Sequence, residues 1–184
     1  KYITARREMG FLVPSKGYEY ATIKGHKCAI IVGDDLSRER DFDQSVETVI
    51  SINARKYGKG TMTYRYEMMR NLAFVESKNL VLVNQVGGST DIVYDGTSGA
   101  LNSRGELVLM MKNFEEDFQI FDTKASARPI SIPSTYNDRT RLVYEAARCG
   151  LRDFFRKNGY RKASIGLSGG IDSAVVACLA ADAL

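Results

Sequence analysis

The sequence of 184 residues predicts an α/β protein made of two parts. Residues 1–122 alternate between runs rich in β-branched residues and apolar patterns of helical spacing. Residues 123–137 contain Pro129, Pro133 and several Ser and Thr residues, a composition typical of a linker. Residues 138–184 have the pattern of a helix, a strand, a glycine turn and a second helix. Together these observations predict two α/β units joined by a linker.

The first part is expected to contain strands, one helix and hairpins. The β-rich runs predict strands at 27–32, 46–52 and 80–85. Apolar residues at helical spacing predict a helix over 64–76, with its stripe at Tyr64, Met68, Met69, Leu72 and Val75. Turn signals predict hairpins beside strands 92–94 and 107–111, at Asp95-Gly96 and Arg104-Gly105.

The second part begins with a helix whose two ends are marked in the sequence. Asp138 fits an N-cap and Gly159 ends the helix. Its expected apolar face comprises Leu142, Val143, Ala146, Leu151, Phe154 and Phe155. A strand is expected over 160–167, followed by a turn at Gly169-Gly170 and a helix from Ile171. One strand cannot make a stable doubly wound sheet, so we expect this part to be the beginning of a larger unit.

Composition limits the classes of function. A hydrophobic content of 44% and a charged content of 26% are ordinary for a soluble globular protein. No apolar run approaches the ~20 residues of a membrane span, so we expect no membrane partner. The net charge of +4 is small and the basic residues are scattered, so we expect no nucleic-acid partner. Arg156-Lys157 is expected to be a solvated helix end. The single His26 excludes a histidine-rich metal site.

The three cysteines are odd in number and lack the spacing of metal ligands. They are Cys28, Cys149 and Cys178. Cys149 and Cys178 lie in helical apolar patterns and are expected to be buried thiols. This cysteine usage predicts a reducing, cytoplasmic setting.

The stretch Ser168-Gly-Gly-Ile-Asp-Ser173 carries the strongest signal of function. A strand that enters a Gly-Gly turn and opens a helix aims free backbone N–H groups at one point, which suits a phosphate. The loop has no lysine and no Walker A ending. The candidate ATP-binding residues are Gly166, Leu167, Ser168, Gly169, Gly170, Ile171, Asp172 and Ser173. Asp172 is the candidate ligand of a Mg²⁺ ion that neutralises pyrophosphate. The alternative is a strand–helix connection capped by Ser168.

Residues 138–184 resemble the opening of the synthetase domain of NAD synthetases. The matching stretches are Leu151-Arg-Asp153, Lys157-Asn-Gly159, Ile165-Gly-Leu-Ser-Gly-Gly-Ile-Asp-Ser-Ala174 and Ala180-Ala-Asp-Ala-Leu184. Other pyrophosphate-loop enzymes share the loop but match fewer of the residues around it. The resemblance implies a doubly wound domain of the adenine-nucleotide α-hydrolase type, of which this chain holds the first α–β–α unit.

Residues 1–122 resemble the amidase domain fused to glutamine-dependent NAD synthetases. The matching stretches are Val83-Asn-Gln-Val-Gly-Gly88, Ile92-Val-Tyr-Asp-Gly96 and Ser98. The resemblance implies the C-terminal half of a nitrilase-like α/β/β/α sandwich. It also implies an ATP- and Mg²⁺-dependent ligase that adenylates deamido-NAD and amidates it with ammonia, taken from glutamine or supplied free. Family members assemble through both domains, so a homo-oligomer is expected.

The family's amidase uses a Cys nucleophile in the pattern Ile-Cys-Glu-Asp-Leu, and the matching stretch here is Val32-Gly-Asp-Asp-Leu36. Gly33 therefore stands at a vacant nucleophile position, and glutaminase activity is expected to be absent. Cys28 lies five residues upstream, an odd shift that places it on the opposite face of the strand, so we interpret it as a buried structural thiol.

Other positions of the amidase pattern also differ. The segments Asn53–Tyr57 and Ser89–Asp91 replace family stretches that touch bound glutamine. Lys1 is the candidate for the family's catalytic lysine, with a solvated terminal lysine as the alternative, and the Glu base is expected before residue 1. The second hypothesis for the whole chain is a non-catalytic nitrilase-like scaffold, or another pyrophosphate-loop amidotransferase.

Overall fold

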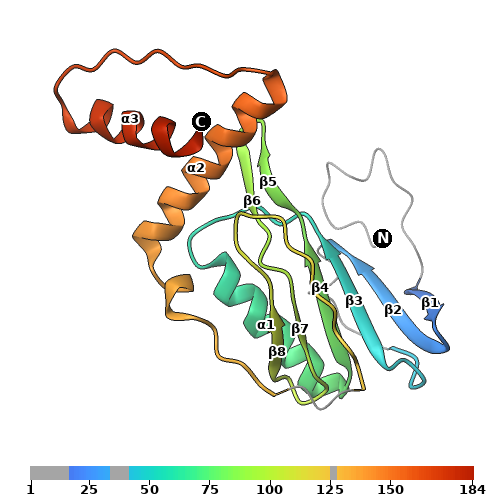
Figure 1. The fold of residues 1–184 in the computed structure, drawn as a ribbon. Helices are drawn as coiled ribbons and strands as arrows, with labels where there is room; N and C mark the ends of the chain where they lie inside the picture. Colours follow the sequence, from blue (N-terminus) through green and yellow to red (C-terminus); the bar gives the residue numbers. More distant parts are fainter. Residues whose placement is uncertain (1–16, 34–41, 125–127) are drawn as a thin grey trace.

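A computed structural model describes residues 17–33, 42–124 and 128–184 (Figure 1). These residues form a β-sheet with helices packed beside it, which confirms the predicted α/β class. Among them, no helix combines the length and the apolar character needed to cross a bilayer.

A six-stranded sheet forms the centre, in the order β1-β2-β3-β4-β7-β8. Its members are β1 (Glu19–Ile23), β2 (His26–Val32), β3 (Thr48–Asn53), β4 (Asn79–Asn84), β7 (Gly99–Leu101) and β8 (Leu107–Met110). The strands β2, β3 and β4 are parallel, and the other neighbours pair antiparallel. The predicted strands are confirmed to within about two residues, whereas β1 and β7 had no clear signal in the sequence.

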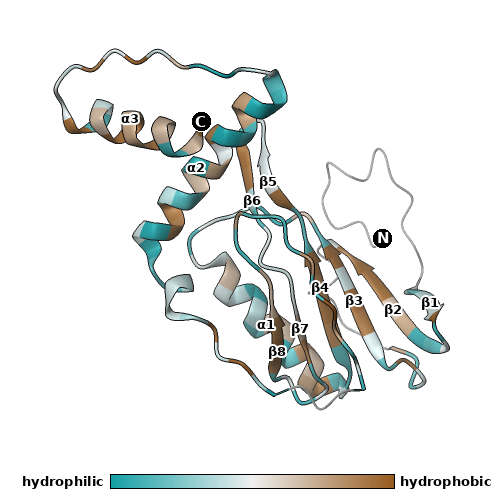
Figure 2. Cartoon of the chain, viewed as in Figure 1, coloured by the Kyte–Doolittle hydropathy of each residue, from teal (hydrophilic) through white to brown (hydrophobic). Residues whose placement is uncertain are grey.

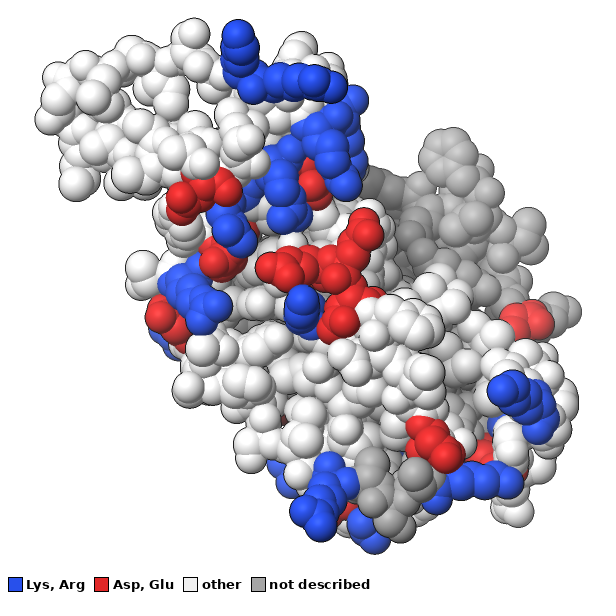
Figure 3. Space-filling model, in the orientation of Figure 1, with Lys and Arg blue, Asp and Glu red and all other residues white. Residues whose placement is uncertain are grey.

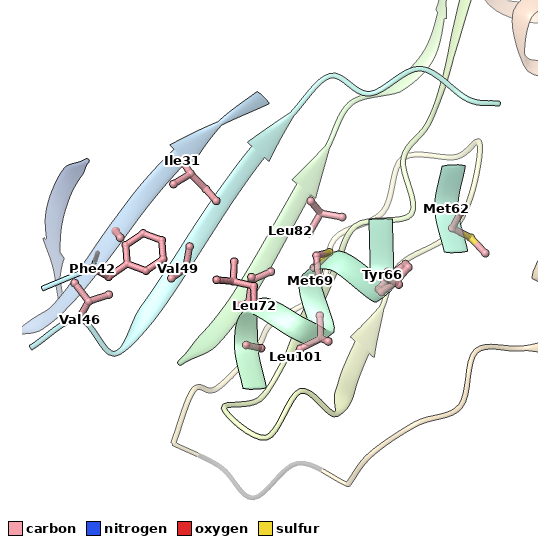
Figure 4. Close-up of a cluster of buried hydrophobic side chains, with 13 residues drawn as sticks. Ile31, Phe42, Val46, Val49, Met62, Tyr66, Met69, Leu72, Leu82 and Leu101 are labelled. Carbon is pink, nitrogen blue, oxygen red and sulfur yellow. The ribbon is translucent and has the colours of Figure 1, made fainter. Parts of the chain in front are cut away.

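Helix α1 (Thr61–Glu76) connects the parallel strands β3 and β4 and covers one face of the sheet (Figures 1 and 4). The main core lies between them and includes Ile31, Val49, Met69, Leu72, Leu80, Leu82 and Leu101. Figure 2 shows β2, β3 and β4 as largely apolar strands. Strands buried by a covering helix read as continuous apolar runs, which is why the sequence located them.

The buried face of α1 differs from the predicted stripe. Tyr64 and Val75 are 59% and 75% exposed, while Arg65 and Tyr66 are buried. The Tyr66 hydroxyl donates to the Thr97 carbonyl at 3.1 Å, and burial raises the pKa of this hydroxyl. The stripe is confirmed at Met69 and Leu72 and wrong at Tyr64 and Val75, because Arg65 and Tyr66 are buried on this helix instead.

A hairpin of β5 (Val86–Ser89) and β6 (Ile92–Asp95) extends beyond the main sheet (Figure 1). Helix α2 (Arg139–Asn158) packs against both hairpin strands, and α3 (Ile171–Ala183) packs against α2. Asp138 accepts a hydrogen bond from the Arg141 N–H, and Gly159 ends α2 at φ 71°. Both predicted ends of this helix are confirmed.

Three expectations for the second part are wrong. Residues 160–167 form no strand: the segment is exposed coil, because no neighbouring strand in the described part of the chain offers it a ladder of hydrogen bonds. Cys178 is exposed. Val143 and Phe154 are 60% and 51% exposed, since α2 buries Ala146, Cys149 and Asp153 instead.

The linker follows the surface of the first part. The Ile130 N–H donates to the Leu107 carbonyl at 2.8 Å, and the short helix η2 (Ser134–Tyr136) leads into α2. The Tyr136 hydroxyl donates to the Met111 carbonyl at 3.2 Å. These few contacts leave most side chains of residues 128–137 exposed.

We expect limited digestion with a protease of broad specificity, such as proteinase K, to cut first within 123–137. Lys124 and Arg128 are exposed and lie at the junction of the proposed domains 1–122 and 138–184. Exposed segments with few hydrogen bonds are nicked before ordered elements. The products, identified by intact mass, should be two fragments whose new ends fall within this segment. Early cleavage within 79–96 would contradict the domain boundary.

Candidate functional site

The carboxyl ends of the three parallel strands lie in one row. Val32 pairs with Ile52, so Gly33 lies one position further, level with Asn53, and Asn53 pairs with Asn84. Gly33 is half-buried and has a φ of 66°, a left-handed conformation that favours glycine. In open α/β sheets, ligands bind at this edge. Gly33, the candidate nucleophile position, therefore lies at the sheet edge where ligands bind in such folds, and its role stays a prediction.

A buried network of hydrogen bonds lies beside these strand ends, centred on Asn84. The Arg55 N–H donates to Asn84 Oδ1 at 2.9 Å, and Asn84 Nδ2 donates to Asp95 Oδ1 at 2.9 Å and to the Gly96 carbonyl at 3.0 Å. The Asn84 side chain thus fixes the backbone that follows β3. Among the described residues, Asn53 has a buried Oδ1 without a hydrogen-bond partner.

Arg65 and Asp95 form a bidentate ion pair inside this network. The distances are 3.1 Å from Nη1 to Oδ1 and 2.9 Å from Nη2 to Oδ2, and both side chains are at most 3% exposed. Paired N–H groups of a guanidinium match the two oxygens of a carboxylate. Sequence reasoning missed this pair, because its members are 30 residues apart and each alone looks like a surface charge.

Cys28 is buried and lies at the opposite end of β2 from Gly33. Five residues of strand separate them, which corresponds to about 16 Å. Burial raises the pKa of the Cys28 thiol, and the charge of Glu47 raises it further. Both effects reduce the thiolate population, so the interpretation as a buried thiol is confirmed. Lys1 and Asp34–Leu36 lie outside the described residues.

The two altered segments lie at different places. Asn53–Tyr57 follows β3 at the same sheet edge as Gly33, and the Tyr57 N–H donates to the Val93 carbonyl at 2.7 Å. Ser89–Asp91 forms the turn of the β5–β6 hairpin, where Thr90 has a φ of 54°. This turn lies near the C-terminal end of α2.

The second candidate region is the turn at Ser168–Ser173, where coil enters α3. Gly169 has a φ of 83°, and Gly170 is the N-cap residue of α3 without a side-chain cap. The Ser173 hydroxyl donates to the Gly170 carbonyl at 2.9 Å and lies 3.1 Å from the Ser168 hydroxyl. The first backbone bond of the helix runs from the Ala174 N–H to the Gly170 carbonyl, at 3.2 Å.

The backbone N–H groups of Ile171, Asp172 and Ser173 precede that bond and belong to the orphan donors of a helix start. Asp172 lies in the first turn and is exposed, as are Gly166 and Leu167. No cluster of three or more potential metal-ligating side chains occurs in the described ranges. A Mg²⁺ ion here would therefore depend on Asp172 together with the phosphates of a nucleotide.

Comparison with known proteins gives the family. Residues 143–184 match the sequence model of NAD synthase. A glutamine-dependent NAD(+) synthetase of Acinetobacter baylyi is 30% identical over 178 residues, which cover 92% of this chain and 33% of the relative. The chain belongs to the glutamine-dependent NAD synthetase family. It spans about a third of the length of the curated relatives it matches.

Solved structures agree with both parts of the fold. The chain aligns with the ADP complex of a glutamine-dependent NAD+ synthetase from Acinetobacter baumannii, with a TM-score of 0.79 and 28% identity over 96% of this chain and 35% of that one. A carbon–nitrogen hydrolase from Helicobacter pylori G27 aligns with a TM-score of 0.51 and 19% identity, over 59% of this chain and 44% of that one. The second likeness shows the fold alone and is consistent with a nitrilase-like half.

Proposed function

We propose that this chain is a segment of an ATP-dependent NAD synthetase that adenylates deamido-NAD and amidates it with ammonia. Residues 1–122 belong to a nitrilase-like amidase half, 123–137 to the linker, and 138–184 to the start of the ATP-binding half. Family membership carries this proposal, since all the full-length relatives compared bear the name of this synthetase. Homo-oligomeric assembly is part of the same proposal.

The turn at Ser168–Ser173 fits the pyrophosphate part of ATP. The positive end of α3 and the N–H groups of its first turn favour a negative charge. Gly169 and Gly170 place no Cβ between the backbone and a phosphate, and the two hydroxyls supply further donors. A bound Mg²⁺ ion would neutralise charge on the leaving pyrophosphate, and Asp172 is the carboxylate placed to hold it.

At the sheet edge we propose that Gly33 leaves the amidase half without a nucleophile. A glycine has no side-chain atom that could form a thioester with glutamine. The φ of 66° at Gly33 supports this assignment, because glycine adopts such a turn at little cost. Ammonia would then reach the synthetase half as free ammonium or from a partner.

The test of this proposal uses Asp172→Asn in the natural polypeptide. Pyrophosphate release from ATP, with deamido-NAD and ammonium present, should fall by roughly a hundredfold or more, since direct charge stabilisation is worth a few kcal/mol. Glu67→Gln is the matched control, because it also removes one exposed negative charge without changing shape, on α1. Adenylation at the wild-type rate in Asp172→Asn would sink the assignment of Asp172.

The alternative is a non-catalytic nitrilase-like scaffold. The observation in its favour is the exposed apolar surface of the second part, where Leu167 and Ile171 are 66% and 78% exposed. The mass of the natural polypeptide distinguishes the two. A mass near 20.5 kDa would favour the scaffold, and a much larger mass would favour the synthetase.

A further inference from the structure

Helix α2 approaches the β5–β6 hairpin closely enough that three glycines are needed at the contact. A Cβ added at Gly88 would lie 3.0 Å from the Gly150 Cα, and one at Gly150 would lie 3.1 Å from a Val93 methyl carbon. A Cβ at Gly87 would lie 2.6 Å from Asp153 Oδ2. The Gly87-Gly88 pair was a family signature in the sequence, and this contact gives it a physical reason.

Asp153 is the buried charge at the centre of this contact. Its side chain is 3% exposed, and Oδ2 accepts a hydrogen bond from the Gly88 N–H at 2.7 Å. The Asp153 carboxylate on α2 therefore binds the backbone of β5, so this hydrogen bond joins the second part of the chain to the first. A hydrogen bond to a charged group is stronger than a neutral one, and leaving the charge unpaired in the interior is costly.

Basic side chains around Asp153 complete the contact. Arg152 Nε and Arg156 Nη2 lie 3.3 Å and 3.5 Å from Asp153 Oδ1, and Lys157 Nζ donates to the Gly88 carbonyl. Figure 3 shows Lys and Arg gathered around this end of α2. Arg156 and Lys157 are exposed in the last turn of α2, which confirms the expected solvated helix end, and Lys157 in addition joins Asp153 in binding both backbone groups of Gly88.

A small apolar cluster lies along the same face of α2. Phe114, Ala146 and Cys149 are buried together, apart from the main core, with Val93 and Leu142 against them. Burial raises the pKa of the Cys149 thiol, and the protonated thiol donates a weak hydrogen bond to Asp153 Oδ2 at 3.9 Å. The contact is thus a separate packed interface with one buried charge.

We propose that Asp153 is a positioning residue, whose carboxylate fastens α2 to the β5–β6 hairpin and so fixes the ATP-binding half on the amidase half. Helix α2 is followed by residues 159–167, which lead into the turn at Ser168–Ser173. This role of Asp153 does not depend on which reaction the second part performs, and it therefore goes beyond the proposed function.

Hydrogen exchange in the natural polypeptide, followed by mass spectrometry, tests the proposal. In Asp153→Ala, peptides covering 86–95 and 139–158 should exchange about ten- to a hundredfold faster, while peptides of α1 and β4 stay unchanged. Asp153→Asn keeps one acceptor for the Gly88 N–H and should give an intermediate effect. Leu72→Ala, a cavity in the main core, should show the converse pattern. Unchanged exchange in 86–95, or equal acceleration everywhere, would overturn the proposal.

A double-mutant cycle gives a second measurement, and Asp153→Ser can replace Asp153→Ala in it if Asp153→Ala folds poorly. Gly87→Ala places a Cβ 2.6 Å from Asp153 Oδ2, so its loss of stability should be smaller in the Asp153→Ser or Asp153→Ala background, which lacks that oxygen, than in the wild type. Asp153→Asn has the same shape as the wild type and should leave the loss unchanged. Gly25→Ala is the control, since its φ of 84° brings the same kind of backbone strain with open space around the Cβ. Additive effects of Gly87→Ala with both Asp153→Ser and Asp153→Ala would contradict the direct contact.

Discussion

We expect the natural polypeptide to synthesise NAD from ammonium salts and to synthesise none from glutamine. Gly33 follows the carboxyl end of β2, and we propose that it stands at the position of the family's Cys nucleophile. Removal of a catalytic nucleophile commonly costs on the order of 10⁶ in turnover. The measurement is NAD formation with each nitrogen donor at saturating ATP and deamido-NAD. Glutamine-dependent synthesis in the purified protein, free of ammonium, would contradict the assignment of Gly33.

Labelling by a glutamine-analogue electrophile gives an independent check. Cys28 and Cys149 are buried with raised pKa values, so Cys178 is the exposed thiol among the described residues. We therefore expect no stoichiometric adduct in a Cys178→Ser background. An adduct on Cys28, seen by intact mass and peptide mapping, would show that this strand end has been aligned wrongly.

Gly33→Cys tests whether the nucleophile is the only part of the proposed amidase site that is missing. A Cys at a φ of 66° carries a backbone cost of about 1–3 kcal/mol, which the surrounding sheet must sustain. The Asn84 side chain accepts a hydrogen bond from the Arg55 N–H and donates one to the Arg55 carbonyl, so the backbone after β3 is held in place. Gly33→Ala is the matched control, since it brings the same strain without a thiol. Glutamine-dependent synthesis in Gly33→Cys alone would locate the defect at this single position, and its absence would direct attention to Asn53–Tyr57 and Ser89–Asp91.

The sequence predicted best those elements whose signals are local. Asp138 and Gly159 mark the ends of α2 through their own backbone and side-chain chemistry, and the structure confirms both. The runs at β2, β3 and β4 indicated strands because they are rich in β-branched residues, although Val32, Ile52 and Val83 are exposed and only one side of each strand is buried. The turn at Gly169-Gly170 and the start of α3 at Ile171 were likewise predicted from neighbouring residues.

Features that depend on distant partners were missed or wrong. The segment 160–167 has strand composition, but a strand requires a neighbour, and the described part of the chain supplies none for it. Asp153 was noted only as part of a family stretch, and its partner, the Gly88 N–H, is 65 positions away in the sequence. Arg65 did not appear in the apolar stripe predicted for 64–76, and its partner Asp95 is 30 positions away. Charges that are buried in pairs cannot be recognised from an apolar pattern.

The buried pair of Arg65 and Asp95 leads to the largest expected loss of stability. Asp95→Ala leaves the Arg65 guanidinium in the interior without its carboxylate, and breaking a buried pair in this way costs about 3–5 kcal/mol. Asn84 Nδ2 loses an acceptor at the same time, so the effect extends to the backbone behind Gly33. The free energy of unfolding should fall by this amount in urea denaturation, with an unchanged dependence on urea concentration.

Two controls separate the buried charge from other causes. Glu115→Ala breaks the exposed pair with Lys112 and should leave the denaturation midpoint nearly unchanged, because solvent screens that pair. The double variant Arg65→Met, Asp95→Leu removes both charges and should recover much of the stability lost in Asp95→Ala, since apolar replacement of a whole buried pair is often close to neutral. If the double variant is as unstable as Asp95→Ala, the loss comes from the hydrogen bond that Asn84 donates to Asp95 rather than from an unpaired guanidinium.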